Sequence, residues 1–201
     1  MASLSTDDRR VLMEVAVASI QAAVSTPESL LLEVDPGEYP PRLREHRASF
    51  VTLHCSKRLR GCRGTIAASE PLVTCTARSA RAAAIFDERF DPVTCDDIPE
   101  LELHISVLTT PKPIPVSSER ELLAFLQCGV HGLVLRGATV EAVFLPSVWE
   151  KLPDPAQFVE HLKAKAGLPA RGESPDILWE WFTAESFEAR AADVRPHTEG
   201  D

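Results

Sequence analysis

Alternation of apolar and polar residues predicts several strands along the chain. Residues 101–107 alternate strictly between the two kinds of side chain, and in residues 50–55 Val51, Leu53 and Cys55 share one face. That period of two is typical of a strand with one face on a core and the other facing solvent. Residues 132–136 and 139–145 predict a hairpin about a turn at Gly137-Ala138, and residues 177–184 predict a last strand.

Apolar residues at helical spacing predict four helices between these strands. The first has Asp7 and Asp8 at its start and ends before Pro27, and the second begins after Pro71. The third follows the capping box Ser118–Glu121. The fourth extends over residues 154–167, because Asp154-Pro155 is a start signal and Gly167 is a stop signal.

The order of these elements predicts an α+β protein with a repeated unit. A hairpin, a helix and a strand follow one another twice, from which we infer an internal duplication. We expect a single domain over residues 1–193 that can be divided into lobes at about residues 1–115 and 116–193. Residues 194–201 hold few apolar side chains and predict a flexible tail.

Composition narrows the class of protein. The chain has 201 residues, of which 44% are hydrophobic and 25% charged, and its formal net charge is −9. This acidic balance argues against general nucleic-acid binding, which needs a basic face. The apolar stretch at residues 11–24 is interrupted by Glu14 and Gln21, so it predicts neither a signal peptide nor a membrane span. We therefore expect a soluble, cytoplasmic protein.

The five cysteines form no metal-binding spacing. They are widely separated, and no C-x-x-C pair occurs among them. We therefore predict no zinc or iron–sulfur site, and the sequence leaves open whether the protein uses a cofactor.

The densest positive charge lies at residues 57–63, where Lys57, Arg58, Arg60 and Arg63 surround Cys62 in an acidic chain. Residues 59–66 are predicted to return as the partner strand of residues 50–55 after a turn at Ser56–Arg58. The hairpin therefore carries the segment Arg60-Gly61-Cys62-Arg63-Gly64-Thr65.

This segment and several others resemble one known family, the AMMECR domain family, called AmmeMemoRadiSam system protein A in bacteria. The similarity covers roughly Leu12 to Phe187. The matching segments are Leu59-Arg60-Gly61-Cys62-x-Gly64-Thr65, Asp87-Glu88-Arg89-Phe90-x-Pro92, Ile105-Ser106-Val107-Leu108-x-x-Pro111, Gly132-Leu133, Leu145-Pro146-x-Val148-Trp149 and Lys165-Ala166-Gly167-Leu168.

The resemblance implies an α+β fold with a curved, mainly antiparallel sheet and flanking helices. It also implies a Memo-like protein and a radical SAM enzyme as partners, but it implies no particular reaction. The chain departs from the family pattern at two positions. Arg63 stands where isoleucine is usual, and His104 stands where relatives often carry an acid.

Our first functional hypothesis is the binding of a small anionic ligand or a protein partner at the Arg60–Thr65 hairpin. Gly61 and Gly64 can expose N–H groups to an anion, and Arg60 can add a bidentate fork. The same glycines also suit a bulge or a close helix contact. Asp87 and Arg89 are expected to line the same cleft or, in the alternative, to form a salt-bridged corner.

The second hypothesis is an enzyme that uses Cys62 as its nucleophile or thiol acceptor. Arg60, helped by Arg63, would stabilise the thiolate. In the alternative, Cys62 only fills a tight space beside two glycines while Arg60 pairs with a carboxylate such as Asp87. His104 is a candidate base, although a single histidine on a polar strand face is more often only solvated.

RNA binding through residues 57–63 is a third, minor hypothesis, because at most about four cations would reach phosphate. The sequence alone leaves open whether the protein catalyses any reaction.

Overall fold

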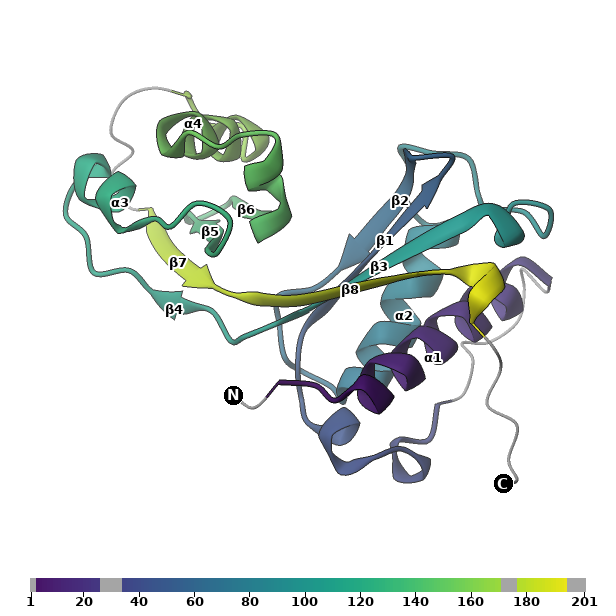
Figure 1. The fold of residues 1–201 in the computed structure, drawn as a ribbon. Helices are drawn as coiled ribbons and strands as arrows, with labels where there is room; N and C mark the ends of the chain where they lie inside the picture. Colours follow the sequence, from purple (N-terminus) through teal and green to yellow (C-terminus); the bar gives the residue numbers. More distant parts are fainter. Residues whose placement is uncertain (1–2, 26–33, 171–176, 195–201) are drawn as a thin grey trace. The chain divides into compact units, whose positions relative to one another are not determined.

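The computed structural model describes residues 3–25, 34–170 and 177–194 (Figure 1). Its contacts divide the chain into two units. The first unit lies within residues 1–108 and 185–201, and the second is residues 109–184. The chain therefore leaves the first unit after Leu108 and returns to it at Glu185.

The first unit is a four-stranded sheet with two helices on one face (Figure 1). The strand order is β2-β1-β3-β8, and β1 pairs antiparallel with both β2 and β3. The elements are α1 (Thr6–Ser25), β1 (Ser49–Cys55), β2 (Arg58–Gly64), α2 (Leu72–Ile85), β3 (Leu101–Leu108) and β8 (Ala184–Arg190).

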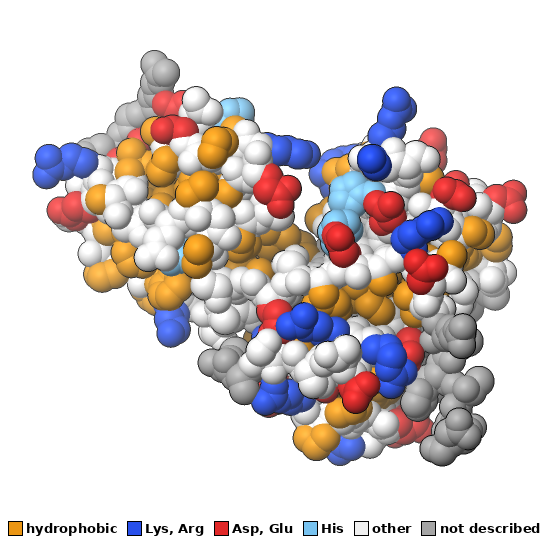
Figure 2. Space-filling view, in the orientation of Figure 1, with side chains coloured by type: hydrophobic (Ala, Val, Ile, Leu, Met, Phe, Trp, Pro, Cys, Tyr) orange, Lys and Arg blue, Asp and Glu red, His pale blue; other side chains and the backbone are white. Residues whose placement is uncertain are grey.

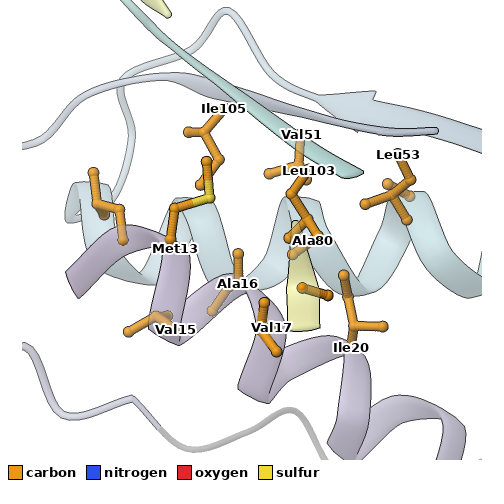
Figure 3. Close-up of a cluster of buried hydrophobic side chains, with 14 of the residues drawn as sticks. Met13, Val15, Ala16, Val17, Ile20, Val51, Leu53, Ala80, Leu103 and Ile105 are labelled. Atoms are coloured by element: carbon orange, nitrogen blue, oxygen red, sulfur yellow. The ribbon is translucent and has the colours of Figure 1, made fainter. Parts of the chain in front are cut away.

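The core of this unit lies between the sheet and its helices. Figure 3 shows Val51, Leu53, Leu103 and Ile105 pointing from β1 and β3 toward the helices. All four side chains are fully buried. The alternating polar residues therefore lie on the opposite face of the sheet, which α1 and α2 do not cover.

A tight turn and a bulge shape the β1–β2 hairpin. Ser56 and Lys57 both have positive φ, 50° and 64°, as a two-residue turn between twisted strands requires. The pairing register shifts within the hairpin, since Leu53 pairs with Gly61 while His54 pairs with Leu59. Arg60 is therefore the extra residue of a β-bulge, and the alternation of side chains along β2 is interrupted there.

Gly61 allows β2 to approach α2 closely. A Cβ atom at this position would lie 2.0 Å from the carbonyl oxygen of Ala83 in α2. Real Cβ contacts are never this short, so any side chain at Gly61 would push the helix and strand apart. Among the roles considered for Gly61, this geometry favours the close helix contact.

The second unit is a smaller sheet with order β4-β7-β5-β6. Strand β4 pairs antiparallel with β7, and β5 pairs antiparallel with both β6 and β7. Trp149 and Phe158 stack in its core at a centroid distance of 3.8 Å. The elements are β4 (Lys112–Pro113), α3 (Glu119–Phe125), β5 (Gly132–Arg136), β6 (Glu141–Phe144), α4 (Pro155–Lys165) and β7 (Leu178–Phe182).

Short 3₁₀ helices complete the described chain at Pro36–Glu38, Pro41–Arg44, Ile98–Glu100, Pro146–Glu150 and Ala191–Asp193. In the described ranges, no helix has both the length and the apolar character needed to cross a bilayer.

The predicted α+β class and antiparallel pairing are confirmed, with the strands divided between two sheets. The strand predicted at residues 177–184 is present as β7, but it is not the last, because β8 follows it and belongs to the other sheet. The strand order β2-β1-β3 in the first unit corresponds to the order β6-β5-β7 in the second. This correspondence alone does not establish the internal duplication, which stays a prediction. The tail prediction mostly concerns residues 195–201, which lie outside the described ranges.

Replacement of Gly61 by alanine tests the close contact of β2 with α2. We expect Gly61→Ala to lower the free energy of unfolding by about 1–3 kcal/mol, because the added methyl group meets backbone rather than a movable side chain. Urea denaturation followed by far-UV circular dichroism measures this change. The control is Gly37→Ala, whose methyl group would meet only the Asp35 side chain, at 3.0 Å. Equal stability of the two variants would contradict the proposed contact.

Candidate functional site at the edge of strand β2

Strand β2 is an edge strand, and two side chains take the place of its missing neighbour at Cys62. The backbone N–H of Cys62 donates to Oδ2 of Asp87 at 2.9 Å. Nη2 of Arg89 lies 3.5 Å from the carbonyl oxygen of Cys62. An unpaired strand edge exposes such groups to pairing with another chain, and here Asp87 and Arg89 satisfy both.

Asp87 and Arg89 form a bidentate ion pair that follows directly after α2. Nε and Nη2 of Arg89 donate to Oδ1 and Oδ2 of Asp87 at 2.8 and 2.6 Å. The Asp87 side chain is 3% exposed, whereas that of Arg89 is 59% exposed. The Arg89 guanidinium, with help from the Cys62 N–H, holds the pKa of Asp87 far below its usual range, and Asp87 in turn raises the pKa of Arg89.

Arg60 attaches the bulge of β2 to the loop that precedes β3. Its Nη1 donates to the carbonyl oxygen of Asp91, and its Nη2 donates to the carbonyl oxygen of Pro92 at 2.9 Å. Nη2 also lies 3.2 Å from Oδ2 of Asp97, which itself accepts the backbone N–H of Thr94 at 2.9 Å. The thiol of Cys62 is not among these partners.

The other residues of the predicted segment make local structural contacts. Nη2 of Arg63 donates to the carbonyl oxygen of Phe86 at 2.7 Å. A Cβ atom at Gly64 would lie 2.4 Å from the carbonyl oxygen of Ser49. The backbone N–H of Thr65 donates to that same oxygen at 3.1 Å, and its hydroxyl accepts the N–H of Ala67.

A depression of about 450 Å³ opens beside this edge. Its lining residues are Arg60, Glu88, Arg89, Phe90 and Asp91. The guanidinium of Arg89 lies over the Phe90 ring, 5.3 Å from its centroid. Two cations, two carboxylates and an aromatic ring therefore line this small depression.

The structure brings Arg60, Cys62, Asp87 and Arg89 of the predicted site together. Arg60 pairs with a carboxylate, as in the alternative interpretation, but this carboxylate is Asp97 and not Asp87, which was given as the example. The hydrogen bonds of Arg60 and Arg63 go to carbonyl oxygens and a carboxylate, and these contacts do not support the expectation that either arginine stabilises a Cys62 thiolate.

Sequence reasoning missed the other partners of this region. The contact between Thr94 and Asp97 could have been expected from the sequence. A hydroxyl residue and an acid three positions apart have the spacing at which they hydrogen-bond to each other. Phe90 and Asp91 carried no signal that separates them from ordinary loop residues. In the part of the chain that the structure describes, no group of three or more His, Cys, Asp or Glu side chains is placed to hold a metal ion.

Comparison with known proteins agrees with the similarity seen in the sequence. The AMMECR1 family model matches residues 13–187. A protein of Methanothermobacter thermautotrophicus is 32% identical over 180 residues, which are 89% of this chain and 90% of the relative. Protein MK0488 of Methanopyrus kandleri is 37% identical over 158 residues, covering 75% and 76% of the two chains.

A solved structure extends the agreement to the fold. The crystal structure of the uncharacterized protein PH0010 from Pyrococcus horikoshii superposes with a TM-score of 0.80 at 31% sequence identity. The match covers 88% of this chain and 89% of that one. The family model, the relatives and the shared fold together show that this chain belongs to the AMMECR1 family.

Proposed function

We propose that the protein is a binding domain that recognises a carboxylate or phosphate group at the edge of β2. The observation that supports this most directly is the guanidinium of Arg89. The buried carboxylate of Asp87 holds Nε and Nη2, so the group has one orientation while most of its side chain stays exposed. Such a fixed arginine loses little conformational entropy when it binds an anion.

The remaining hydrogen-bonding capacity of Arg89 suits this role. Among the described residues, its Nη1 has no hydrogen-bond partner, and the depression lies beside it. A carboxylate or phosphate oxygen that reached Nη1 would make a charge-assisted hydrogen bond. Arg60 lines the same depression and adds positive charge.

The charges of Glu88 and Asp91 limit which ligands would fit. Their carboxylates balance the two arginines, so the depression offers no net attraction to a free anion at long range. A ligand that combines anionic with cationic groups, or a protein surface of mixed charge, suits this lining better than a polyanion. The low positive charge also argues against RNA as the ligand.

The family resemblance supports a Memo-like protein and a radical SAM enzyme as partners that would present such a surface. The exposed aromatic side chain of Phe86, next to the Asp87–Arg89 pair in the chain, adds apolar area of the kind found in protein interfaces.

Replacement of Arg89 by glutamine tests the binding proposal. We expect inorganic phosphate to shift the amide resonances of Cys62 and Arg89 in a saturable way in the unchanged protein. Arg89→Gln should abolish these shifts, because it removes the charge and the free N–H groups. Arg89→Lys should weaken them, since lysine keeps the charge and loses the fork.

The matched control for this titration is Arg78→Gln. Arg78 is also exposed on the first unit and pairs with Glu70, away from the depression. Its loss should leave the phosphate-dependent shifts in place. The proposal is wrong if phosphate leaves the Cys62 and Arg89 resonances unchanged, or if both glutamine variants lose the shifts equally.

Asp87→Asn tests whether the carboxylate organises the site. We expect it to lower the free energy of unfolding at pH 7 by about 1.5–3 kcal/mol, because a buried acceptor loses its charge and part of its hydrogen bonding. The low pKa of Asp87 also fixes the sign of the pH effect. The ionised Asp87 carboxylate stabilises the folded protein fully above about pH 4, the pKa range of an aspartate in the unfolded chain. This stabilisation is lost progressively as the pH falls below that range toward the low pKa of the folded state.

Urea denaturation of the two proteins between pH 7 and pH 3 measures both effects. The stability difference between the unchanged protein and Asp87→Asn should shrink as the pH falls. The control is Asp96→Asn, since Asp96 is exposed and has no hydrogen bond or ion pair in the described part of the chain. A constant difference across this pH range would contradict the assigned role of the carboxylate.

A further inference from the structure

Arg47 is a buried arginine that lies just before β1. Its exposed fraction is 5%, and its Nε atom is fully buried without a hydrogen-bond partner. Within the described ranges, the guanidinium makes no hydrogen bond and no ion pair. Taking a cation out of water is costly unless hydrogen-bond acceptors or an opposite charge replace the water. The Arg47 guanidinium therefore needs a negative group that this part of the chain does not supply.

The side chain of Arg47 points toward the helices of the first unit. The ladder between β1 and β3 continues beyond Ser49, because the N–H of Leu108 donates to the carbonyl oxygen of Ala48 at 2.9 Å. Arg47 therefore lies on the same sheet face as Ser49, whose hydroxyl contacts α2, and as Val51, which points toward the helices in Figure 3.

The N-terminus of α2 lies beside Arg47. His46 pairs with Pro71, the residue before the helix. The N–H of Leu72, the first residue of the helix, donates to the carbonyl oxygen of Glu45 at 2.9 Å. The chain just before β1 is thus attached to the first turn of α2.

This end of α2 has no cap. Pro71 provides no side-chain hydrogen bond, and no acidic residue lies in the first turn. In the part of the chain that the structure describes, the N–H groups of Val73 and Thr74 have no acceptor, and the Thr74 hydroxyl is buried without a partner. The preceding acid, Glu70, is paired with Arg78. The positive end of the helix dipole therefore lacks a negative group.

The buried guanidinium and the helix terminus are two positive groups in one place. Burial is the main cause that lowers the pKa of Arg47; Glu185 and Glu45 raise it without reaching ion-pair distance, and Arg42 lowers it further. Glu185 pairs instead with Arg9, at 2.7 Å. Figure 2 shows basic and acidic side chains interspersed over α1, so the exposed charges there have neighbours of opposite sign, unlike Arg47.

We propose that Arg47 and the N-terminus of α2 form a binding site for a small oxyanion, which is a phosphate or a carboxylate group. Its oxygens accept hydrogen bonds from the Arg47 guanidinium, from the N–H groups of Val73 and Thr74 and from the Thr74 hydroxyl. Anions bind at helix N-termini because the free N–H groups and the dipole both favour negative charge there. The bound anion also screens the guanidinium from the helix dipole.

This site is distinct from the depression beside β2. Asp87 and Arg89 follow the C-terminal end of α2, whereas Arg47 lies at its N-terminal end. The helix has 14 residues, so its ends are about 20 Å apart. A single titration therefore reports the two sites at different amides, and either site can fail without the other.

Amide NMR during a phosphate titration tests the proposal. Sodium phosphate replaces sodium chloride at constant ionic strength, so general screening does not change. We expect saturable shifts of the Val73 and Thr74 resonances in the unchanged protein. Arg47→Met should abolish these shifts, Arg47→Lys should weaken them, and Arg89→Gln should leave them in place. A parallel titration with sodium acetate shows whether phosphate or carboxylate binds more tightly.

The matched control is Arg44→Met. Arg44 lies in the same basic segment, is exposed, and donates to the carbonyl oxygens of Tyr39 and Gly37. Its loss should leave the anion-dependent shifts of Val73 and Thr74 unchanged.

Thermal unfolding gives a second readout. In phosphate-free buffer, Arg47→Met should unfold at a temperature no lower than the unchanged protein, because the variant lacks a buried charge without a partner. Phosphate at ten times its dissociation constant should raise the unfolding temperature of the unchanged protein by about 3 °C more than that of Arg47→Met.

Three results would overturn the proposal. In the first, neither phosphate nor acetate shifts the Val73 and Thr74 resonances in a saturable way. In the second, Arg44→Met loses the shifts as completely as Arg47→Met does. In the third, Arg47→Met unfolds well below the unchanged protein in phosphate-free buffer, which would show that Arg47 already has a partner within the protein.

Discussion

The carboxylate of Asp87 is the group on which the candidate site depends. It accepts the backbone N–H of Cys62 on one side and the guanidinium of Arg89 on the other. Each contact fixes something different. The first closes the edge of β2 where an incoming chain could otherwise pair, and the second holds an exposed cation in one orientation. A buried carboxylate persists only with such partners, so the contacts depend on one another.

Packing between α2 and β2 places Asp87 beside this edge. Gly61 lets the strand lie against the last turns of the helix at Ala83, and Asp87 follows the end of that helix within a few residues. Arg60 and Arg63 then hold the chain after α2 to the strand by bonding its carbonyl oxygens. Arg60 and Arg63 of the basic segment thus have a structural task, and the Arg89 side chain beside them stays largely exposed.

Much of the fold was predictable because its signals are local. Alternation identified β1 and β3, and proline and glycine marked the limits of α4. Strand β8 was missed because Ala184–Arg190 has few apolar residues and follows β7 without a turn signal. The bulge at Arg60 depends on the register with β1, which no local pattern reveals.

The candidate site was predictable in its members but not in its contacts. Asp87 and Arg89 are two residues apart, so an ion pair between them could be expected from the sequence. The bond from Cys62 to Asp87 spans 25 positions, and that from Arg60 to Asp97 spans 37. The contact of His104 with Glu188 could not be predicted either, because without β8 there was no reason to place Glu188 beside His104.

Amide hydrogen exchange at Cys62 tests the central role of Asp87 most directly. If the carboxylate closes the strand edge, the Cys62 amide should exchange slowly in the unchanged protein, although it lies on an edge strand. In Asp87→Asn the same amide should exchange much faster, while the amides that pair β1 with β3 keep their protection. Fast exchange at Cys62 in the unchanged protein, or equal exchange in both proteins, would contradict the account.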